Sequence, residues 1–366
     1  MVRVLVLINE ITQTSIPFEI ASNIARRTDI DVTVASFYDD PAAPLPVEIS
    51  APLEIRLLGA TTRFDLSVWR QLQRELGKGY DILHTHHNFT GSVARVLAAT
   101  QGNAIVNTEH RNHDSFTRLQ NGVNAPTLAL ADRLVSNSRT TQSSLRWYET
   151  ALLPNERLRV VHNGVDLERI AAVTTGSTAD SQSERNQVNQ VITVGRMVPV
   201  KDHETLLRAF RSVSERIPEA VLVLVGDGPL RDDLETLAEH LSITDRVTFT
   251  GRLPRESVYE RLSTSDAFVL PSLAEGFCVA AVEAMACGVP VVASDIDVLR
   301  EVLGEAGTFV PTEDTAAFAD AIAHLLSNDE ERRMRGQTGR QRVEDRFTID
   351  RVAHEYYNIY EAVHKG

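Results

Sequence analysis

The chain alternates short hydrophobic runs with longer amphipathic stretches from one end to the other. The short runs are rich in β-branched residues, and the stretches between them repeat hydrophobic residues at helical spacing. This alternation is typical of parallel β-sheets whose strands are connected by covering helices. In the first half we expect strands over Val2–Ile8, Asp31–Ser36, Leu53–Leu57, Ile82–His84, Ala104–Thr108, Arg133–Ser136 and Leu158–His162.

The same alternation restarts in the second half. We expect strands there over Val191–Gly195, Val221–Val225, Val247–Thr250, Ala267–Leu270, Val289–Ala293 and Gly307–Val310. Helices are expected between them, for example over Glu204–Arg216 and Leu230–His240, and a last helix over Ile349–Val363. The fold class is therefore α/β, with two doubly wound, Rossmann-like units rather than one large sheet.

A segment of small and polar residues separates the two halves. Residues 171–190 show no hydrophobic periodicity, which indicates a linker or surface loop. We therefore expect residues 1–170 to form one domain, 191–345 a second, and 346–366 a helix that crosses back to the first. Because ligands of parallel sheets bind beyond the carboxyl ends of the strands, the site is expected in a cleft between the two domains.

Composition narrows the class of protein. With 37 Lys+Arg against 50 Asp+Glu, the net charge is −13, which argues against a dedicated nucleic-acid binder. The two cysteines, Cys278 and Cys287, are nine residues apart on a predicted helix, too far for a disulfide. The start of the chain lacks the pattern of a secretory signal, and no hydrophobic run reaches the roughly 18 residues of a membrane span. We expect a cytoplasmic protein, peripheral to a membrane at most.

Two cations mark the first candidate site. Arg196 and Lys201 follow the predicted strand Val191–Gly195 and precede a predicted helix, so they lie at the carboxyl end of a strand. There they could bind a phosphate or diphosphate. A solvated loop with one surface ion pair is the alternative, and this segment alone does not decide between the two.

Two carboxylates mark the second candidate site. Glu275 precedes, and Glu283 lies on, a predicted helix over about Phe277–Cys287. Eight helical positions separate residues by about 12 Å, so the two carboxylates cannot share one metal, but they can contact two separate hydroxyl groups of a long ligand. Free N–H groups at the helix start favour an anion, and Gly276 permits close approach to the backbone. Two ordinary surface glutamates are the alternative, which the apolar neighbours of Glu283 disfavour.

Taken together, these motifs resemble the family 4 glycosyltransferases, also known as glycosyl transferases group 1, which have the two-domain GT-B fold. The resemblance rests on Gly-Arg before Lys201, on Pro-Ser, on the spacing of Glu275 and Glu283, and on Glu-Ala-Met-Ala-x-Gly-x-Pro-Val-Val. Further matches are Val225-Gly226-Asp227-Gly228-Pro229, Phe249-Thr250-Gly251-Arg252-Leu253 and Asn163-Gly164-Val165-Asp166.

The resemblance implies retaining transfer of a hexose-type sugar from a nucleotide-sugar donor, without a cofactor or an essential metal. It implies that Arg196 and Lys201 bind the diphosphate, Glu283 the ribose, and Glu275 the transferred sugar. The other donor contacts that it implies are Gly226, Arg252, Leu253, Gly276, Phe277 and Cys278.

Histidines gather in the first half, in His84-Thr-His86-His87 and His110-Arg-Asn-His113. A zinc site is one interpretation, but no cysteine or ordered carboxylate spacing accompanies it. The resemblance implies no metal, and it places Asp81–His86 and Asn107–His110 at strand ends on the acceptor side. We expect His110 to line the reaction centre and His86 to be second, and we expect structural roles for His87, His113 and His162.

One loop departs from the family pattern. The loop after the first strand, Asn9–Pro17, lacks the usual Gly-Gly pair, so we expect the hydroxyls of Thr14 and Ser15 to substitute on the acceptor side. Asn163 is the remaining acceptor-side candidate. The catalytic candidates are then His110, Glu275, Arg196 and Lys201.

The acceptor is not readable from the sequence, and a glycan, a lipid and a small molecule all remain open, in cell-surface glycan or glycolipid synthesis. The amphipathic, basic stretch Arg63–Lys78 either contacts an anionic membrane or packs Leu66, Trp69 and Leu72 into its own domain. A protein that binds a nucleotide sugar without transferring it is the alternative function. An NAD-dependent oxidoreductase is excluded, because neither half has a Gly-x-Gly-x-x-Gly turn after its first strand.

Overall fold

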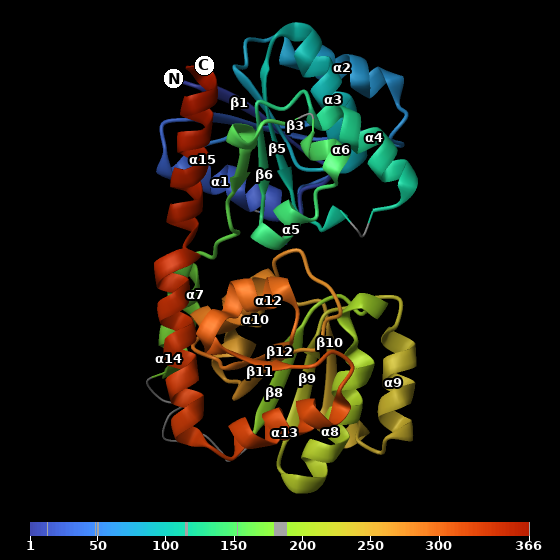
Figure 1. Ribbon diagram of the computed structural model, residues 1–366, viewed down its shortest axis with the longest axis vertical. Coiled ribbons are helices and arrows are strands. Elements are labelled where there is room, and N and C mark those ends of the chain that lie inside the picture. Colours follow the sequence, from blue (N-terminus) through green and yellow to red (C-terminus); the bar gives the residue numbers. More distant parts are fainter. Residues whose placement is uncertain are drawn as a thin grey trace. The chain divides into compact units, whose positions relative to one another are not determined.

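A computed structural model describes residues 1–12, 14–47, 49, 51–113, 116–151, 153–178 and 189–365. The chain forms two compact units (Figure 1). Unit 1 consists of Met1–Asn163 together with Ile349–Gly366, and unit 2 consists of Gly164–Thr348. Each unit is an open parallel sheet with helices on both faces, which confirms the predicted α/β class.

The sheet of unit 1 has the strand order β3-β2-β1-β4-β5-β6-β7. The chain winds outward from β1 in one direction and from β4 in the other, so the sheet is doubly wound. Its strands are β1 (Arg3–Ile8), β2 (Asp31–Ser36), β3 (Glu54–Leu57), β4 (Ile82–Thr85), β5 (Ala104–Glu109), β6 (Arg133–Ser136) and β7 (Leu158–Val160).

Helices cover both faces of this sheet. One core lies between the strands and α1 and α15, and another between the strands and α2 and α3. Figure 1 shows α15 lying alongside α1, although about 320 residues separate them in the chain. The helices are α1 (Ile16–Arg27), α2 (Leu66–Leu76), α3 (Asn88–Gln101), α4 (Arg118–Leu128), α5 (Arg139–Ser143), α6 (Trp147–Thr150) and α15 (Ile349–His364).

The sheet of unit 2 has the order β10-β9-β8-β11-β12-β13, with its winding direction reversing between β8 and β11. Its strands are β8 (Gln190–Val194), β9 (Val221–Val225), β10 (Val247–Gly251), β11 (Ala267–Leu270), β12 (Val291–Ser294) and β13 (Gly307–Val310). Its helices are α7 (Leu167–Thr178), α8 (His203–Arg216), α9 (Arg231–His240), α10 (Arg255–Ser263), α11 (Val279–Ala286), α12 (Asp297–Leu303), α13 (Thr315–Leu326) and α14 (Asp329–Arg346).

The structure corrects the predicted boundary between the halves. Residues 164–170, assigned above to the first domain, belong to unit 2, as do residues 346–348. Helix α7 runs through Leu167–Thr178 and so occupies the first part of the predicted linker. This helix was not predicted because the small residues of the segment give it little hydrophobic periodicity. The rest of the predicted linker, residues 179–188, lies outside the described residues.

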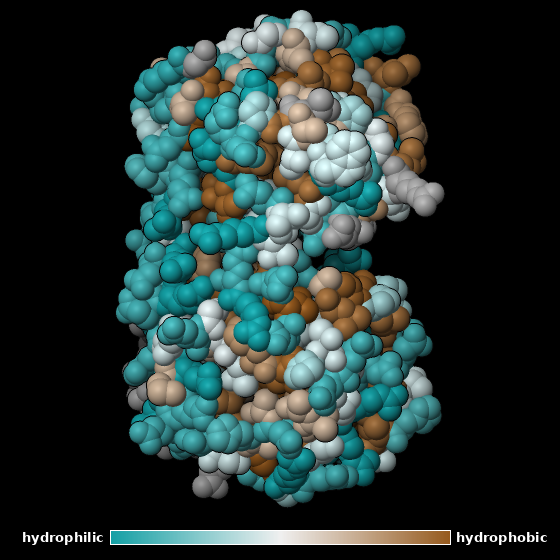
Figure 2. All heavy atoms as spheres, viewed as in Figure 1, coloured by the Kyte–Doolittle hydropathy of each residue, from teal (hydrophilic) through white to brown (hydrophobic). Residues whose placement is uncertain are grey.

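The stretch Arg63–Lys78 contains helix α2, which packs only part of its hydrophobic side chains into unit 1. Trp69 and Leu72 are buried as expected of a packed helix, whereas Leu66 is 68% exposed and Phe64 is 69% exposed. The packing alternative therefore holds for Trp69 and Leu72 and is wrong for Leu66. Hydrophobic side chains reach the surface beside α2 (Figure 2). Among the described helices, none is both long and hydrophobic enough to span a bilayer.

Candidate active site

The carboxyl ends of four neighbouring strands position the predicted residues of unit 2. Arg196 and Lys201 follow β8, Gly226 follows β9, Arg252 follows β10, and Glu275 follows β11. Because the strands are parallel, all of these loops emerge at one edge of the sheet. The reversal between β8 and β11 makes this edge the place where doubly wound sheets bind ligands.

Lys201 and Glu275 form an ion pair at this edge of the sheet, although 74 positions separate them in the chain. Ser272 Oγ donates a hydrogen bond of 2.8 Å to the same oxygen, Glu275 Oε1. The amide of Leu273 donates to the carbonyl of Val200 at 2.9 Å and joins the two loops. The side chains of Lys201 and Glu275 are only 21% and 8% exposed, so the solvated-loop alternative fails for Lys201.

The charge of Lys201 is stabilised where it lies. Burial by itself lowers the pKa of this amine, but the charge of the Glu275 carboxylate and its hydrogen bond to the ammonium outweigh burial and raise the pKa above its ordinary value. Lys201 is therefore a cation at neutral pH. Arg196, on the same loop, is exposed. One cation of this loop is thus held in place by Glu275, and the other reaches the surface.

Glycines set the path of the loop that carries both cations. A Cβ on Gly226 would lie 2.0 Å from the carbonyl oxygen of Gly195, and one on Gly228 would lie 2.4 Å from that of Met197. The φ angle of Gly226 is 133°, a region that side chains disfavour. The amides of Gly195 and Met197 in turn donate to the β9 end of the sheet at 2.9 and 3.0 Å. The Gly-Asp-Gly segment after β9 therefore supports the cationic loop.

Helix α11 begins two residues later than the sequence predicts. Cys278 has φ 69°, in the left-handed region, and stands as the N-cap residue, so Phe277 is not helical. A non-glycine residue in this region costs free energy that the surrounding packing has to offset. Phe277 is 2% exposed and meets Phe347 edge to face. Burial raises the pKa of Cys278 to about 12, so its sulfur is a neutral thiol.

Glu283 is buried inside unit 2 and is held by α10. Its Oε1 accepts from Arg255 Nε at 2.8 Å and from Tyr259 OH at 3.2 Å, and Arg255 Nη2 lies 2.8 Å from the same atom. Arg255 and Tyr259 are not among the residues predicted from the sequence. A signal was present, because a carboxylate among alanines needs a cation, and positions 255 and 259 share one helix face.

Three histidines of unit 1 stack in a row. His86 Nδ1 lies 2.9 Å from His110 Nε2, and the rings of His84 and His86 have centroids 4.0 Å apart. His84 bonds Tyr360 OH at 2.7 Å and Thr108 Oγ1 at 2.8 Å, which anchors the row to α15. Burial lowers the pKa of His84 to about 3 and that of His110 to about 4. At neutral pH these rings are uncharged.

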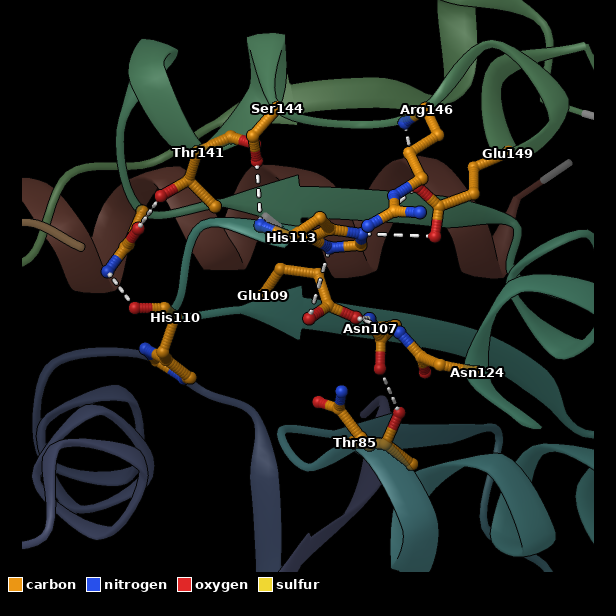
Figure 3. A network of polar contacts seen from close by, with 12 residues as sticks. Thr85, Asn107, Glu109, His110, His113, Asn124, Thr141, Ser144, Arg146 and Glu149 are labelled. Carbon is orange, nitrogen blue, oxygen red and sulfur yellow. Dashed lines mark hydrogen bonds and ion pairs between the residues drawn. The ribbon is translucent and has the colours of Figure 1, made fainter. Parts of the chain in front are cut away.

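A buried polar network fixes the loop that carries His110 (Figure 3). His113 Nδ1 bonds Glu149 Oε1 at 3.0 Å, and its Nε2 lies 3.5 Å from Glu109 Oε2. Burial opposes the charge of His113, but the neighbouring carboxylates of Glu109 and Glu149 raise its pKa to about 9. Asn137 Nδ2 donates to the carbonyl of His110 at 3.1 Å. His113 is thus a structural cation behind the predicted reaction-centre histidine.

The remaining acceptor-side candidates lie in unit 1 as well. Thr14 is exposed, and Ser15 is the N-cap residue of α1, with no hydrogen bond from its side chain to the helix. Asn163 is 5% exposed and is the last residue of this part of unit 1. Unit 1 therefore brings His86 and His110 into contact, and unit 2 brings Lys201 and Glu275 into contact. In the described residues, no group of three or more His, Cys, Asp or Glu side chains is arranged to hold a metal.

Two family profiles match the chain. The profile for glycosyl transferases group 1 matches residues 177–342, and that for glycosyltransferase family 4 matches residues 18–169. The D-inositol 3-phosphate glycosyltransferase of Salinispora tropica is 29% identical over 93% of this chain and 80% of its own length. The N-acetyl-alpha-D-glucosaminyl L-malate synthase of Bacillus anthracis is 28% identical over 76% of this chain and 74% of its own length.

Solved structures share the fold. Sucrose-phosphate synthase from Thermosynechococcus elongatus superimposes with a TM-score of 0.82 and 23% identity, covering 99% of each chain. Anabaena HepE in complex with UDP-glucose superimposes with a TM-score of 0.80 and 17% identity, covering 99% of this chain and 100% of its own. These likenesses identify the two sheets as a GT-B architecture.

Proposed function

The chain belongs to glycosyltransferase family 4 and is a glycosyltransferase, and on that premise we propose that it moves a hexose-type sugar from a nucleoside-diphosphate sugar to an acceptor hydroxyl, with retention of configuration. The observation that carries this proposal is the Lys201–Glu275 pair at the carboxyl edge of β8 and β11. It sets one cation for a diphosphate beside one carboxylate for sugar hydroxyls.

We assign the donor contacts as follows. Lys201 and the exposed Arg196 bind the diphosphate, and the Gly276–Cys278 amides before α11 add N–H donors. Glu283 accepts the ribose hydroxyls. The loops at Gly226 and Arg252–Leu253 line the nucleotide, because they emerge from β9 and β10 at the same edge.

The reaction breaks the bond between the sugar's anomeric carbon and the phosphate oxygen. Positive charge develops on the sugar ring and negative charge on the departing diphosphate, which Lys201 and Arg196 stabilise. The acceptor oxygen forms the new bond on the face that the phosphate leaves, and its proton passes to the departing phosphate oxygen. His110 of unit 1 stays our candidate for the acceptor side, and its ring is uncharged at neutral pH because burial lowers its pKa to about 4.

UDP-glucose is the first donor to test, because HepE binds it on the same fold. The acceptor proposal favours small anionic molecules, since relatives are named for D-inositol 3-phosphate and for L-malate. Glycan and lipid acceptors, and a role in cell-surface glycan or glycolipid synthesis, stay predictions. We also propose that transfer needs no metal, so a chelator should leave the rate unchanged.

Peripheral membrane contact is part of the proposal for unit 1. Phe64 and Leu66 are exposed, and the Arg63 guanidinium lies 5.6 Å from the ring of Phe64. Exposed aromatic and aliphatic groups beside a cation favour an anionic bilayer surface. Co-sedimentation with phosphatidylglycerol vesicles tests this, and a Phe64→Ser/Leu66→Ser variant should bind less. Equal binding of both chains, or none by the wild type, contradicts membrane contact through this surface.

The proposed function is tested by measuring, in the same reaction, cleavage of the donor and transfer of its sugar to an acceptor. The chain is incubated with UDP-glucose, UDP-N-acetylglucosamine, GDP-mannose or ADP-glucose and with inositol phosphate or malate, and released nucleoside diphosphate and glycosylated product are measured. We expect product with one donor and a loss of at least about 100-fold in Lys201→Ala. Binding without release in every combination would favour the alternative, a nucleotide-sugar-binding protein that does not transfer.

A further inference from the structure

We propose that Arg255 is a positioning residue for the donor, and that it sets recognition of the ribose by fixing the carboxylate of Glu283. This inference rests on the proposed function, because Glu283 is assigned there to the ribose. It adds a residue that acts through Glu283 rather than on the ligand.

The contacts of Glu283 are one-sided. Arg255 Nε and Nη2 both lie 2.8 Å from Oε1, and Tyr259 OH lies 3.2 Å from it. Within the described part of the chain, every hydrogen bond and ion pair of this carboxylate is made by Oε1. Oε2 is thereby left as the oxygen that can accept from ligand hydroxyls, and its direction is set by how Oε1 is held.

Burial of both side chains makes the charge of Glu283 depend on Arg255. Arg255 is 8% exposed and Glu283 is 7% exposed, so neither charge is compensated by bulk water. Removing the guanidinium would leave a buried carboxylate that either takes up a proton or turns toward other donors. In the first case Oε2 is no longer part of a charged carboxylate, and in the second it no longer points toward the ribose hydroxyls. Helices α10 and α11 can stay folded in both cases.

The position of Arg255 in the chain joins two parts of the donor edge. It is the first residue of α10, directly after Pro254 and two residues after Leu253, on the connection that leaves β10. Glu283 lies on α11, after β11. Their ion pair therefore ties the β10 loop to the helix that carries the ribose carboxylate. Tyr259, one turn further along α10, strengthens the same tie.

Comparing ligands with and without ribose hydroxyls distinguishes a positioning role of Arg255 from a role in stability alone. The full chain is titrated with UDP, ADP and GDP and with the 2′,3′-dideoxy form of each. For the base that binds best, the dissociation constant of the dideoxy form is divided by that of the form with both hydroxyls. A variant that is only less stable weakens both ligands alike and keeps the ratio. A variant that misplaces Oε2 weakens only the ligand that carries hydroxyls, so the ratio falls.

The variants are Arg255→Met, Arg255→Lys, Tyr259→Phe and Glu283→Gln. Arg261→Met is the matched control, since Arg261 is an exposed arginine on the same helix. We expect a wild-type ratio of about tenfold or more. It should fall to within about threefold of unity in Arg255→Met and in Glu283→Gln, stay unchanged in the control, and recover in part in Arg255→Lys. Tyr259→Phe should be intermediate, and it decides the question if Arg255→Met does not fold.

The possible failures are distinguishable. If Glu283→Gln lowers the ratio but Arg255→Met keeps the wild-type value, or Tyr259→Phe keeps it where Arg255→Met does not fold, the positioning role is overturned and the proposed function stands. If the wild type binds both ligand forms equally, or Glu283→Gln keeps the ratio, the ribose assignment fails and the positioning role fails with it. If no nucleoside diphosphate binds the wild type, the proposed function itself is overturned.

Discussion

Replacing Glu275 by glutamine should improve nucleotide binding and impair sugar transfer at the same time. In the structure, Glu275 is 8% exposed and forms an ion pair with the Lys201 ammonium. A phosphate oxygen bound to that ammonium would lie about 4.6 Å from the carboxylate oxygen, since each contact to the nitrogen is about 2.8 Å and the N–H directions of an ammonium diverge by about 109°. Diphosphate binding therefore brings two anions close together.

The size of the effect follows from that distance. Two unit charges about 4.6 Å apart repel by about 3.6 kcal/mol at an effective dielectric constant of about 20. Salt and the partial exposure of Lys201 reduce this to about 1 kcal/mol, which corresponds to about fivefold in affinity. Loss of a charged acceptor for sugar hydroxyls should lower kcat by about 10- to 100-fold.

Calorimetry with UDP, or with the nucleoside diphosphate that binds best, measures the first effect, and nucleoside diphosphate release measures the second. Glu256→Gln is the control, because Glu256 is a half-exposed carboxylate of the same unit, paired with Arg169. It should change neither quantity. Weaker nucleotide binding by Glu275→Gln than by the wild type, or an unchanged kcat, would refute the reasoning.

Three further predictions concern other parts of the molecule. Because the folded state raises the pKa of His113 from 6.5 to about 9, its stabilisation of about 3 kcal/mol is complete below pH 6.5 and is lost as pH rises through about 9. Urea unfolding of wild type and His113→Phe should therefore converge at alkaline pH, and a difference that does not depend on pH contradicts this. Gly228→Ala should cost about 2 kcal/mol or more and reduce nucleotide binding, since its Cβ would meet the Met197 carbonyl. Gly122→Ala in α4, with nothing within 4 Å, should stabilise by about 0.5–1 kcal/mol, and thermal unfolding of both variants checks the pair. Cys278 and Cys287, whose pKa values burial raises to about 12, should resist iodoacetamide at pH 8 until the chain is denatured, and rapid labelling of the folded chain contradicts this.

The central strands of both sheets, such as β1, β4 and β11, could be predicted because they are buried on both faces and therefore appear as hydrophobic runs. β11 and β13 have the predicted bounds. β7 and β12 are shorter than predicted, because pairing within the sheet decides where a strand ends. Helix α7 was missed, since its small residues carry little periodicity.

The candidate site could be predicted only as far as local motifs reach. The loops of Lys201 and Glu275 were found by their positions after strands, but their direct contact spans 74 positions and depends on the strand order. The His113–Glu149 pair spans 36 positions and was not predicted. The left-handed Cys278 was also missed, because side-chain type alone favours a helix that starts earlier.

The central claim is that the Lys201–Glu275 edge of unit 2 binds and activates a nucleotide sugar. Its most direct test is the rate of nucleoside diphosphate release coupled to product formation, measured for wild type and Lys201→Ala with the donor and acceptor that react fastest. We expect turnover by the wild type and a loss of at least about 100-fold in the variant, with the fold intact by thermal unfolding. A folded Lys201→Ala chain that transfers sugar at the wild-type rate would contradict it.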